Sequence, residues 1–212
     1  MPVLTARGAG VRQRRRWLFR DLDVTIEPGE LVAVAGAPGS GRTTTLLALA
    51  RRFRLSSGTV TVDGRPALGY VPGVSDVEPV FTVTEHIRER LALLGRDRRE
   101  ARDVDLRGLD PKVQGRDLSP YAKQVLGLVL AMLEEPAVIA LDGLDAGLDA
   151  REQAELLAML TEIAAGGTAV LLTVREIDPA AVTTVIRLGA DAPASPGETE
   201  VSEEDGSDEE SE

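Results

Sequence analysis

The segment GAPGSGRTTT, residues 36–45, has the residue types and spacing of a phosphate-binding loop. In the pattern G-x-x-x-x-G-K-[ST], glycines let backbone N–H groups surround phosphate oxygens, and the following helix adds its N-terminus. Arg42 replaces the lysine of the pattern, so the positive charge stays but a planar fork stands in place of a compact ammonium. The sequence predicts a polyphosphate site with these binding residues: Gly36, Ala37, Pro38, Gly39, Ser40, Gly41, Arg42, Thr43 and Thr44.

A divalent-cation site is predicted from Thr43 and Asp142. Thr43 occupies the hydroxyl position that binds Mg²⁺ in loops of this kind. Asp142 follows the apolar run AVIAL, which predicts a buried strand that ends in a carboxylate. Ligands of open α/β sheets bind beyond the carboxyl ends of the strands, so both residues fall at one edge. Asp142 as a simple polar cap of its strand is the alternative.

Predicted strands and helices alternate along the chain. Residues 22–35 read as a half-buried strand, a Pro28-Gly29 turn and a buried strand that enters the loop. Segment 58–71 predicts a hairpin that turns at Asp63-Gly64. Further helices are expected after Gly41, over 84–94 with Thr84 as N-cap, from Ser119-Pro120, and over 151–165, with buried strands at 137–141 and 168–174. This alternation predicts an α/β fold, a mainly parallel sheet flanked by helices, with an antiparallel β portion near the N-terminus.

The net charge of −11 is concentrated in one segment. Residues 189–212 hold ten acidic residues and no basic ones, and residues 1–188 hold 25 acidic and 24 basic residues. This composition predicts a disordered acidic tail, 189–212, after a domain that spans 1–188. Basic charge gathers in RQRRR, residues 12–16, expected at an exposed hairpin tip. Cysteine is absent, which excludes disulfides, and apolar runs such as VLGLVLAML are too short for a bilayer, so a cytoplasmic protein is expected.

Several segments occur in an order that is more specific than the loop alone. They are PGELVAVAG (28–36), SSGTVTVDG (56–64), TVTEHI (82–87), LS (118–119), LDGLDAGLD (141–149) and LLTV (171–174). Over about residues 3–188 this order resembles the nucleotide-binding domain of ATP-binding cassette (ABC) transporter proteins. The resemblance implies ATP and Mg²⁺ as ligands, a homo- or heterodimer with another ABC subunit, and an integral-membrane permease-like partner at the inner face of the cell membrane. It also implies a short helical insert, about 74–136, of the kind that contacts permeases.

The chain departs from this family where hydrolysis is carried out. Gly143 replaces the glutamate that polarises the attacking water, Val174 the switch histidine, Gly73 a glutamine that contacts metal and water, and LSPYAKQ (118–124) the signature LSGGQ. A positioned base contributes about 10²–10⁴ in rate, and glycine has no side chain to supply one. No residue of 6–11 offers an aromatic ring to adenine, which leaves Trp17, and the sole histidine, His86, is expected to be exposed. We therefore expect Mg-ATP binding with impaired or absent hydrolysis and assign no catalytic residue.

Three other functions stay open at this point. The chain could be a transporter ATPase that hydrolyses ATP slowly, or a non-catalytic regulatory or structural partner of a membrane protein that needs no turnover. A small-molecule kinase with a lid at Arg96–Arg102 is opposed by LDAGLD and by the missing lysine. Nucleic-acid binding is not expected, because only Arg12–Arg16 favours it and the acidic tail opposes it.

Overall fold

The computed structural model describes residues 1–189 of the chain. Its centre is a five-stranded sheet, in the order β5-β6-β7-β3-β8, in which each adjacent pair is parallel. The strands are β3 (Leu31–Gly36), β5 (Pro66–Leu68), β6 (Val138–Leu141), β7 (Ala169–Val174) and β8 (Thr184–Leu188). Strand β3, which leads into the glycine loop, lies inside the sheet between β7 and β8.

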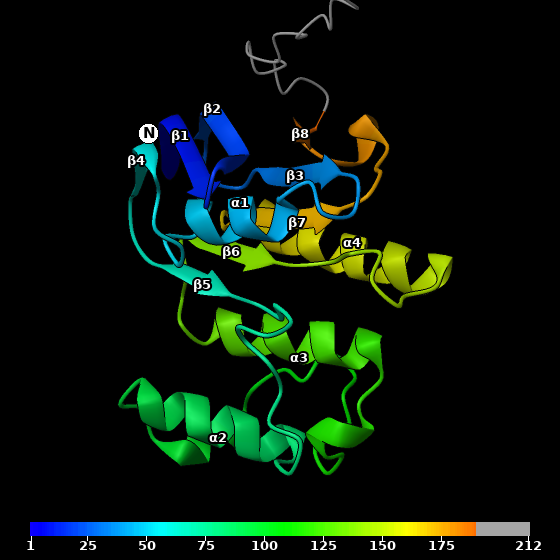
Figure 1. Cartoon of the computed structure of the whole chain (residues 1–212). Coiled ribbons are helices and arrows are strands. Elements are labelled where there is room, and N and C mark those ends of the chain that lie inside the picture. The colour runs from blue at the N-terminus through cyan, green and yellow to red at the C-terminus, as the bar shows by residue number, and fades with distance from the viewer. Residues whose placement is uncertain (190–212) are drawn as a thin grey trace, which may run out of the picture.

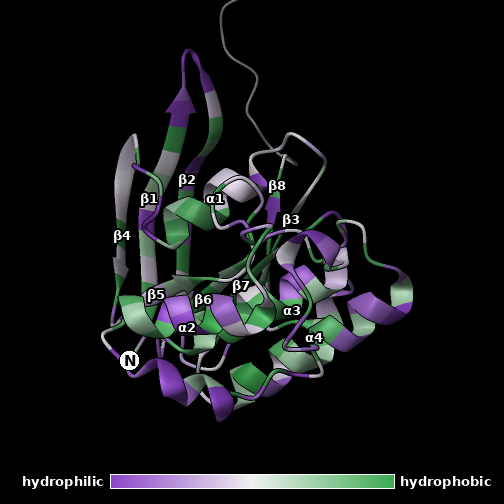
Figure 2. Ribbon diagram, turned by 90° about the horizontal axis from the view of Figure 1, so that it is seen from below, coloured by the Kyte–Doolittle hydropathy of each residue, from purple (hydrophilic) through white to green (hydrophobic). Residues whose placement is uncertain are grey.

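A second sheet is antiparallel and has the order β2-β1-β4, with β1 (Leu4–Gln13), β2 (Arg16–Ile26) and β4 (Ser57–Val62). It lies on the side of the parallel sheet that carries α1 (Arg42–Leu49) (Figure 1). The β1–β2 connection is an exposed hairpin in which Gln13 pairs with Arg16, and its tip is coloured as hydrophilic (Figure 2). The predicted hairpin tip at Arg12–Arg16 is therefore confirmed.

The prediction of a hairpin over 58–71 is wrong. Strand β4 pairs with β1 in the antiparallel sheet, whereas β5 pairs in parallel with β6. Asp63-Gly64 does turn the chain, with Gly64 at φ 95°, but the turn sends it from one sheet to the other. Burial explains this outcome, because Ala67 of β5 is fully buried in the core around the parallel sheet.

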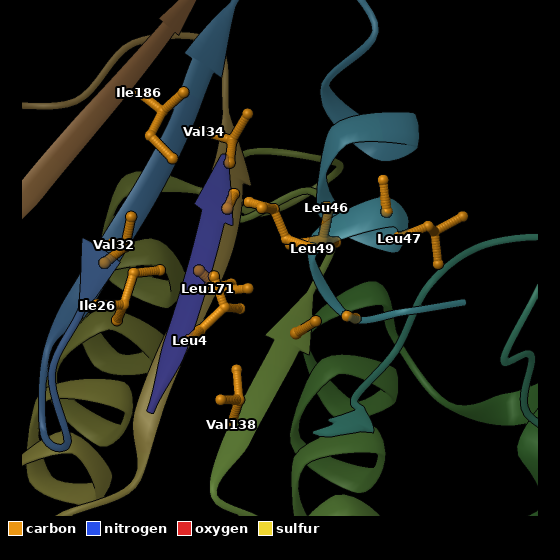
Figure 3. Packing of buried hydrophobic residues seen from close by; sticks show 14 of the residues in the cluster. Leu4, Ile26, Val32, Val34, Leu46, Leu47, Leu49, Val138, Leu171 and Ile186 are labelled. Carbon is orange, nitrogen blue, oxygen red and sulfur yellow. The ribbon is translucent and has the colours of Figure 1, made fainter. Parts of the chain in front are cut away.

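The alternation of side chains along β3 divides the core between the two faces of the parallel sheet. Val32 and Val34 face a cluster shared with α1 and the antiparallel sheet, where Leu46 and Leu49 of α1 point toward the strands (Figure 3). Ala33 and Ala35 face the opposite cluster, which contains Leu128, Leu156 and Leu160 from helices α3 (Pro120–Met132) and α4 (Ala150–Ala165). Strands covered on both faces account for the nearly continuous apolar sequence of β3, β6 and β7.

Between β5 and β6 in the chain lie α2 (Val83–Leu93), the 3₁₀ turns η1 (Arg98–Arg102) and η2 (Gly115–Asp117), and α3. Helix α3 covers the parallel sheet, and α2 packs on the far side of α3 (Figure 1). Ile87 and Leu91 of α2 are buried in a third cluster with Val125 and Leu126 of α3. The short turn η3 (Pro179–Ala181) precedes β8.

Polar side-chain caps set the starts of α2, α3 and α4. Ser119 caps α3 with Pro120 at the first helical position, as predicted, and α4 ends at Gly166. The N-cap of α2 is Thr82, not the predicted Thr84. Thr82 accepts the Glu85 N–H while Glu85 accepts the Thr82 N–H, a reciprocal capping box that Thr84 has no glutamate to complete.

His86 is buried, contrary to the prediction that it is exposed; its exposed fraction is 5%. Its Nδ1 lies 2.8 Å from the Thr82 carbonyl oxygen, and its ring meets Phe81 edge-on at 5.6 Å. The early start of α2 brings His86 into the first turn, where Phe81 covers it. The predicted tail beyond residue 189 lies outside the described residues.

Candidate functional site: a glycine loop and the carboxylate beside it

The predicted phosphate loop connects the carboxyl end of β3 to the N-terminus of α1. Gly39 and Gly41 have φ of 80° and 91°, in the left-handed region that favours glycine. A Cβ at Gly36 would lie 2.9 Å from the Leu188 carbonyl oxygen, and one at Gly41 would lie 2.9 Å from that of Leu18. The three glycines therefore permit the path of the loop between β8 and β2.

The first turn of α1 has no side-chain cap and no acidic residue. An α-helix leaves its first N–H groups without a partner inside the helix, and its N-terminus carries a partial positive charge. At Arg42, Thr43 and Thr44 these N–H groups are left for an external acceptor. This arrangement suits an anion.

Two side chains of the loop carry buried polar atoms that have no hydrogen-bond partner among the described residues. They are Nη1 of Arg42 and Oγ of Ser40. A buried polar group left unpaired costs about 1–3 kcal/mol, and more when it is charged. A phosphate group in the loop would supply acceptors for a guanidinium and a hydroxyl. Both atoms therefore fit the predicted ligand.

The structure brings Thr43 and Asp142 together. Thr43 Oγ1 donates to Asp142 Oδ2 at 2.9 Å, across 99 residues of sequence. Asp142 directly follows β6, and its N–H donates to the Tyr70 carbonyl oxygen at 3.1 Å. A hydroxyl and a carboxylate beside a phosphate loop are the protein groups with which Mg²⁺ is commonly held, together with phosphate oxygens and water. The residues present fit Mg²⁺ with a bound polyphosphate.

Protein ligands alone would not hold the cation. Within residues 1–189 there is no group of three histidine, cysteine, aspartate or glutamate side chains arranged for a metal. The cation would therefore depend on phosphate oxygens for much of its coordination, which is the usual behaviour of Mg²⁺. This dependence would link metal binding to nucleotide binding.

Gly143 directly follows Asp142. Its φ is 78°, and a Cβ at this position would lie 2.8 Å from the Ala146 Cβ. Its N–H donates to Thr173 Oγ1 at 2.7 Å. The backbone at this position is thus shaped for glycine.

Two other carboxylates near this segment, those of Asp145 and Glu176, do not replace a side chain at Gly143. Asp145 Oδ2 accepts from Arg175 Nε at 2.8 Å, and its side chain is 17% exposed. Glu176 is exposed and lines a depression of about 460 Å³ beside Gly36 and Pro38. Asp145 is therefore engaged in an ion pair, and Glu176 lies on the β8 side of the loop.

The segment LSPYAKQ forms the start of α3. The Ser119 hydroxyl accepts the Ala122 N–H at 3.1 Å, so it caps its own helix. Gln124 is buried, and its Nε2 donates to the Asp142 carbonyl oxygen at 2.8 Å. Sequence reasoning missed Gln124 and Thr173 as neighbours of Asp142. The available signal was a polar residue within an otherwise apolar helix or strand.

Trp17, the remaining candidate for stacking on adenine, lies on β2. It is next to Leu18, whose carbonyl oxygen lies close to Gly41 of the loop. The Arg12 guanidinium is 5.9 Å from the centre of its ring, and a Cβ at Gly10 would lie 3.0 Å from its Cζ3. Trp17 therefore packs against β1 and Arg12.

Comparison with known proteins identifies the family. The sequence pattern of the ABC transporter family matches residues 19–144. The chain is 30% identical to the hemin import ATP-binding protein HmuV of Myxococcus xanthus, covering 84% of this chain and 77% of the relative. It is 28% identical to the zinc import ATP-binding protein ZnuC of Jannaschia, and the match covers 84% of this chain and 74% of that relative.

A solved structure shares the fold. The ATP-binding cassette MJ0796, in a dimeric post-hydrolysis state with ADP and phosphate, superposes with a TM-score of 0.74 at 18% identity, covering 87% of this chain and 94% of that one. A P-loop domain with a parallel sheet, flanking helices and an antiparallel portion is thus shared. The match of the family pattern over more than half of the chain, together with the relatives, shows that the chain belongs to the ABC transporter family.

Proposed function

We propose that this chain is the nucleotide-binding subunit of an ABC transporter-like complex, and that it binds Mg-ATP with impaired or absent hydrolysis. The observation that carries the proposal is the Thr43–Asp142 contact beside the uncapped start of α1. Gly36–Thr44 would bind the phosphates, and Thr43 and Asp142 would hold Mg²⁺. Bound Mg²⁺ would neutralise phosphate charge.

Impaired hydrolysis is supported by the backbone at Gly143. Gly143 has no side chain that could polarise water. Its backbone lies in the left-handed region, and its N–H is bonded to Thr173. Asp145 is paired with Arg175, so its carboxylate is engaged elsewhere. Pro120 at the first position of α3 and Ser119 as its cap leave the start of this helix unlike a glycine-rich signature. A partner subunit would have to supply any missing group.

We also propose a permease-like integral-membrane partner, reached through the helical region of about 74–136, and a dimer with a second ABC subunit. The relatives named above are ATP-binding proteins for hemin and zinc import, which supports a transport role. No helix within residues 1–189 has both the length and the apolar character to cross a bilayer. A peripheral position at the inner face of the cell membrane is part of this proposal.

The experiment combines two measurements on one sample. Calorimetric titration with ATP, with and without Mg²⁺, tests binding, and a phosphate-release assay tests turnover; Thr43→Ala and Asp142→Ala are the controls. We expect Mg²⁺-dependent binding in the wild type, and phosphate release no faster than in the two controls. Turnover clearly above the controls would show a working ATPase. Absence of ATP binding would favour the alternative, a structural partner that needs no nucleotide.

A further inference from the structure

The cation site has a third side chain that neither the loop pattern nor the family comparison assigns. We propose that Thr173 is a positioning residue: its hydroxyl orients the Asp142 carboxylate toward the loop and holds the peptide that follows. The inference rests on the proposed function, because Asp142 matters here as a ligand of Mg²⁺. It concerns a residue of β7, the strand that lies between β6 and β3.

The direction of each hydrogen bond at Thr173 is determined by its partners. The side chain is 2% exposed, so water does not compete for the hydroxyl. Gly143 N–H can only donate, and it lies 2.7 Å from Thr173 Oγ1. The hydroxyl proton is therefore left for Asp142 Oδ1, its second partner. One hydroxyl thus accepts from the backbone and donates to the carboxylate.

This donation divides the two oxygens of Asp142 between two hydroxyls. Oδ1 is held by Thr173 at the end of β7, and Oδ2 faces Thr43 in the loop at 2.9 Å. The terminal torsion of an aspartate is intrinsically broad and has no sharply preferred angle. The Thr173 hydroxyl restrains this torsion from the β7 side, so that Oδ2 is presented to the loop.

The same residue also holds the main chain after Asp142. Gly143 N–H bonds the Thr173 side chain, and Leu144 N–H bonds the Thr173 carbonyl oxygen at 2.9 Å. Residues 142–144 are thereby tied to the end of β7 by three hydrogen bonds. Of these, the Leu144 bond uses only the Thr173 backbone and would survive a change of side chain.

Thr173→Val isolates the hydroxyl, because valine has nearly the shape of threonine and lacks the donor and acceptor. ATP affinity is measured by calorimetry in Mg²⁺ and in chelator, and the ratio of the two affinities gives the Mg²⁺ enhancement. We expect the enhancement to fall by about tenfold or more, the loss typical when a residue that orients a metal ligand is removed. Affinity in chelator should stay unchanged, since the loop's main chain binds the phosphates.

Two further variants separate positioning from packing. Thr173→Ser keeps the hydroxyl and should restore most of the enhancement. Thr168→Val removes a hydroxyl next to the other end of β7, where it bonds the Pro136 carbonyl oxygen at 3.4 Å, and should leave the enhancement unchanged.

The inference is overturned if Thr173→Val keeps the full enhancement, or if Thr173→Ser loses as much as Thr173→Val. A uniform loss of affinity with and without Mg²⁺ would assign Thr173 to packing alone and also overturn it. A wild type that binds ATP equally well in chelator would instead overturn the proposed Mg²⁺ site, and this inference with it. The wild-type measurement therefore distinguishes the two failures.

Discussion

At the scale of single residues, the site combines groups suited to phosphate binding with a glycine in the left-handed region directly after Asp142. Arg42 keeps the charge of the missing lysine and holds a buried N–H for an acceptor. Gly143 lacks a side chain and also occupies a conformation that disfavours one. We therefore propose that a single substitution at this position does not create a group that activates water.

Gly143→Glu should therefore fail to create an efficient ATPase. The left-handed conformation costs a non-glycine residue about 1–2 kcal/mol, and the new Cβ would meet Ala146. We expect phosphate release to stay at the level of Asp142→Ala and the melting temperature to fall. Gly147→Glu, at a φ of 76° on the exposed surface, is the control for backbone strain alone. A gain approaching the roughly 10²–10⁴-fold of a positioned base would contradict this expectation.

Arg42→Ala should weaken ATP binding about 10–100-fold, because a hydrogen bond to a charged group contributes about 1.5–3 kcal/mol. Titration calorimetry measures the change. Arg54→Ala removes the same charge from an exposed position after α1 and should bind ATP like the wild type. Equal weakening in both variants would mean that only the overall charge of the protein matters.

At the scale of elements, caps and partners decide where helices and strands lie. Alternation and apolar runs were enough to predict the buried strands, and Ser119-Pro120 was enough to predict the start of α3. The hairpin over 58–71 was predicted wrongly, because Asp63-Gly64 indicates a turn but not which sheet the next strand joins. Thr173 was missed for a related reason. A polar residue in an apolar strand is visible in the sequence, but its contact with Asp142 depends on the order of β6 and β7 in the sheet, which a local pattern does not contain.

The capping box of α2 gives this helix a predictable pH dependence. The backbone hydrogen bond from Thr82, and then the one from its hydroxyl, lower the pKa of Glu85 from its ordinary 4.5. A carboxylate with a lowered folded-state pKa stabilises the protein above its unfolded pKa, and this contribution is lost as pH falls through the folded value.

We therefore expect Glu85→Ala to melt below the wild type at neutral pH, and the difference to shrink as the pH is lowered through 4.5 and below. Thermal melts of both proteins across this range measure it. Glu89→Ala, on the same helix but outside the cap, should show a smaller difference at neutral pH. A difference that grows on acidification would show that the sign is wrong.

At the scale of the whole molecule, we propose one domain over residues 1–188. The three core clusters among the described residues draw on elements from Val3 to Ile186, and β8 supplies one neighbour of β3.

A chain that ends at Gly189 should consequently melt within about 2 °C of the full chain, a shift that corresponds to less than about 1 kcal/mol in a domain of this size. A chain that ends at Thr183 loses β8 and uncovers an edge of β3, so it should melt far lower or fail to fold. Calorimetry of the three chains tests the boundary. A large drop on removal of 190–212 alone would place part of that segment in the domain.

The position of β3 has a consequence for synthesis on the ribosome. This strand emerges early, yet both of its neighbours, β7 and β8, come from residues 169–188. Pairing over such a long separation is slow, because the chain must close a large loop first. A nascent polypeptide stalled before residue 169 should therefore be unable to retain nucleotide, although every residue of the glycine loop has already been translated.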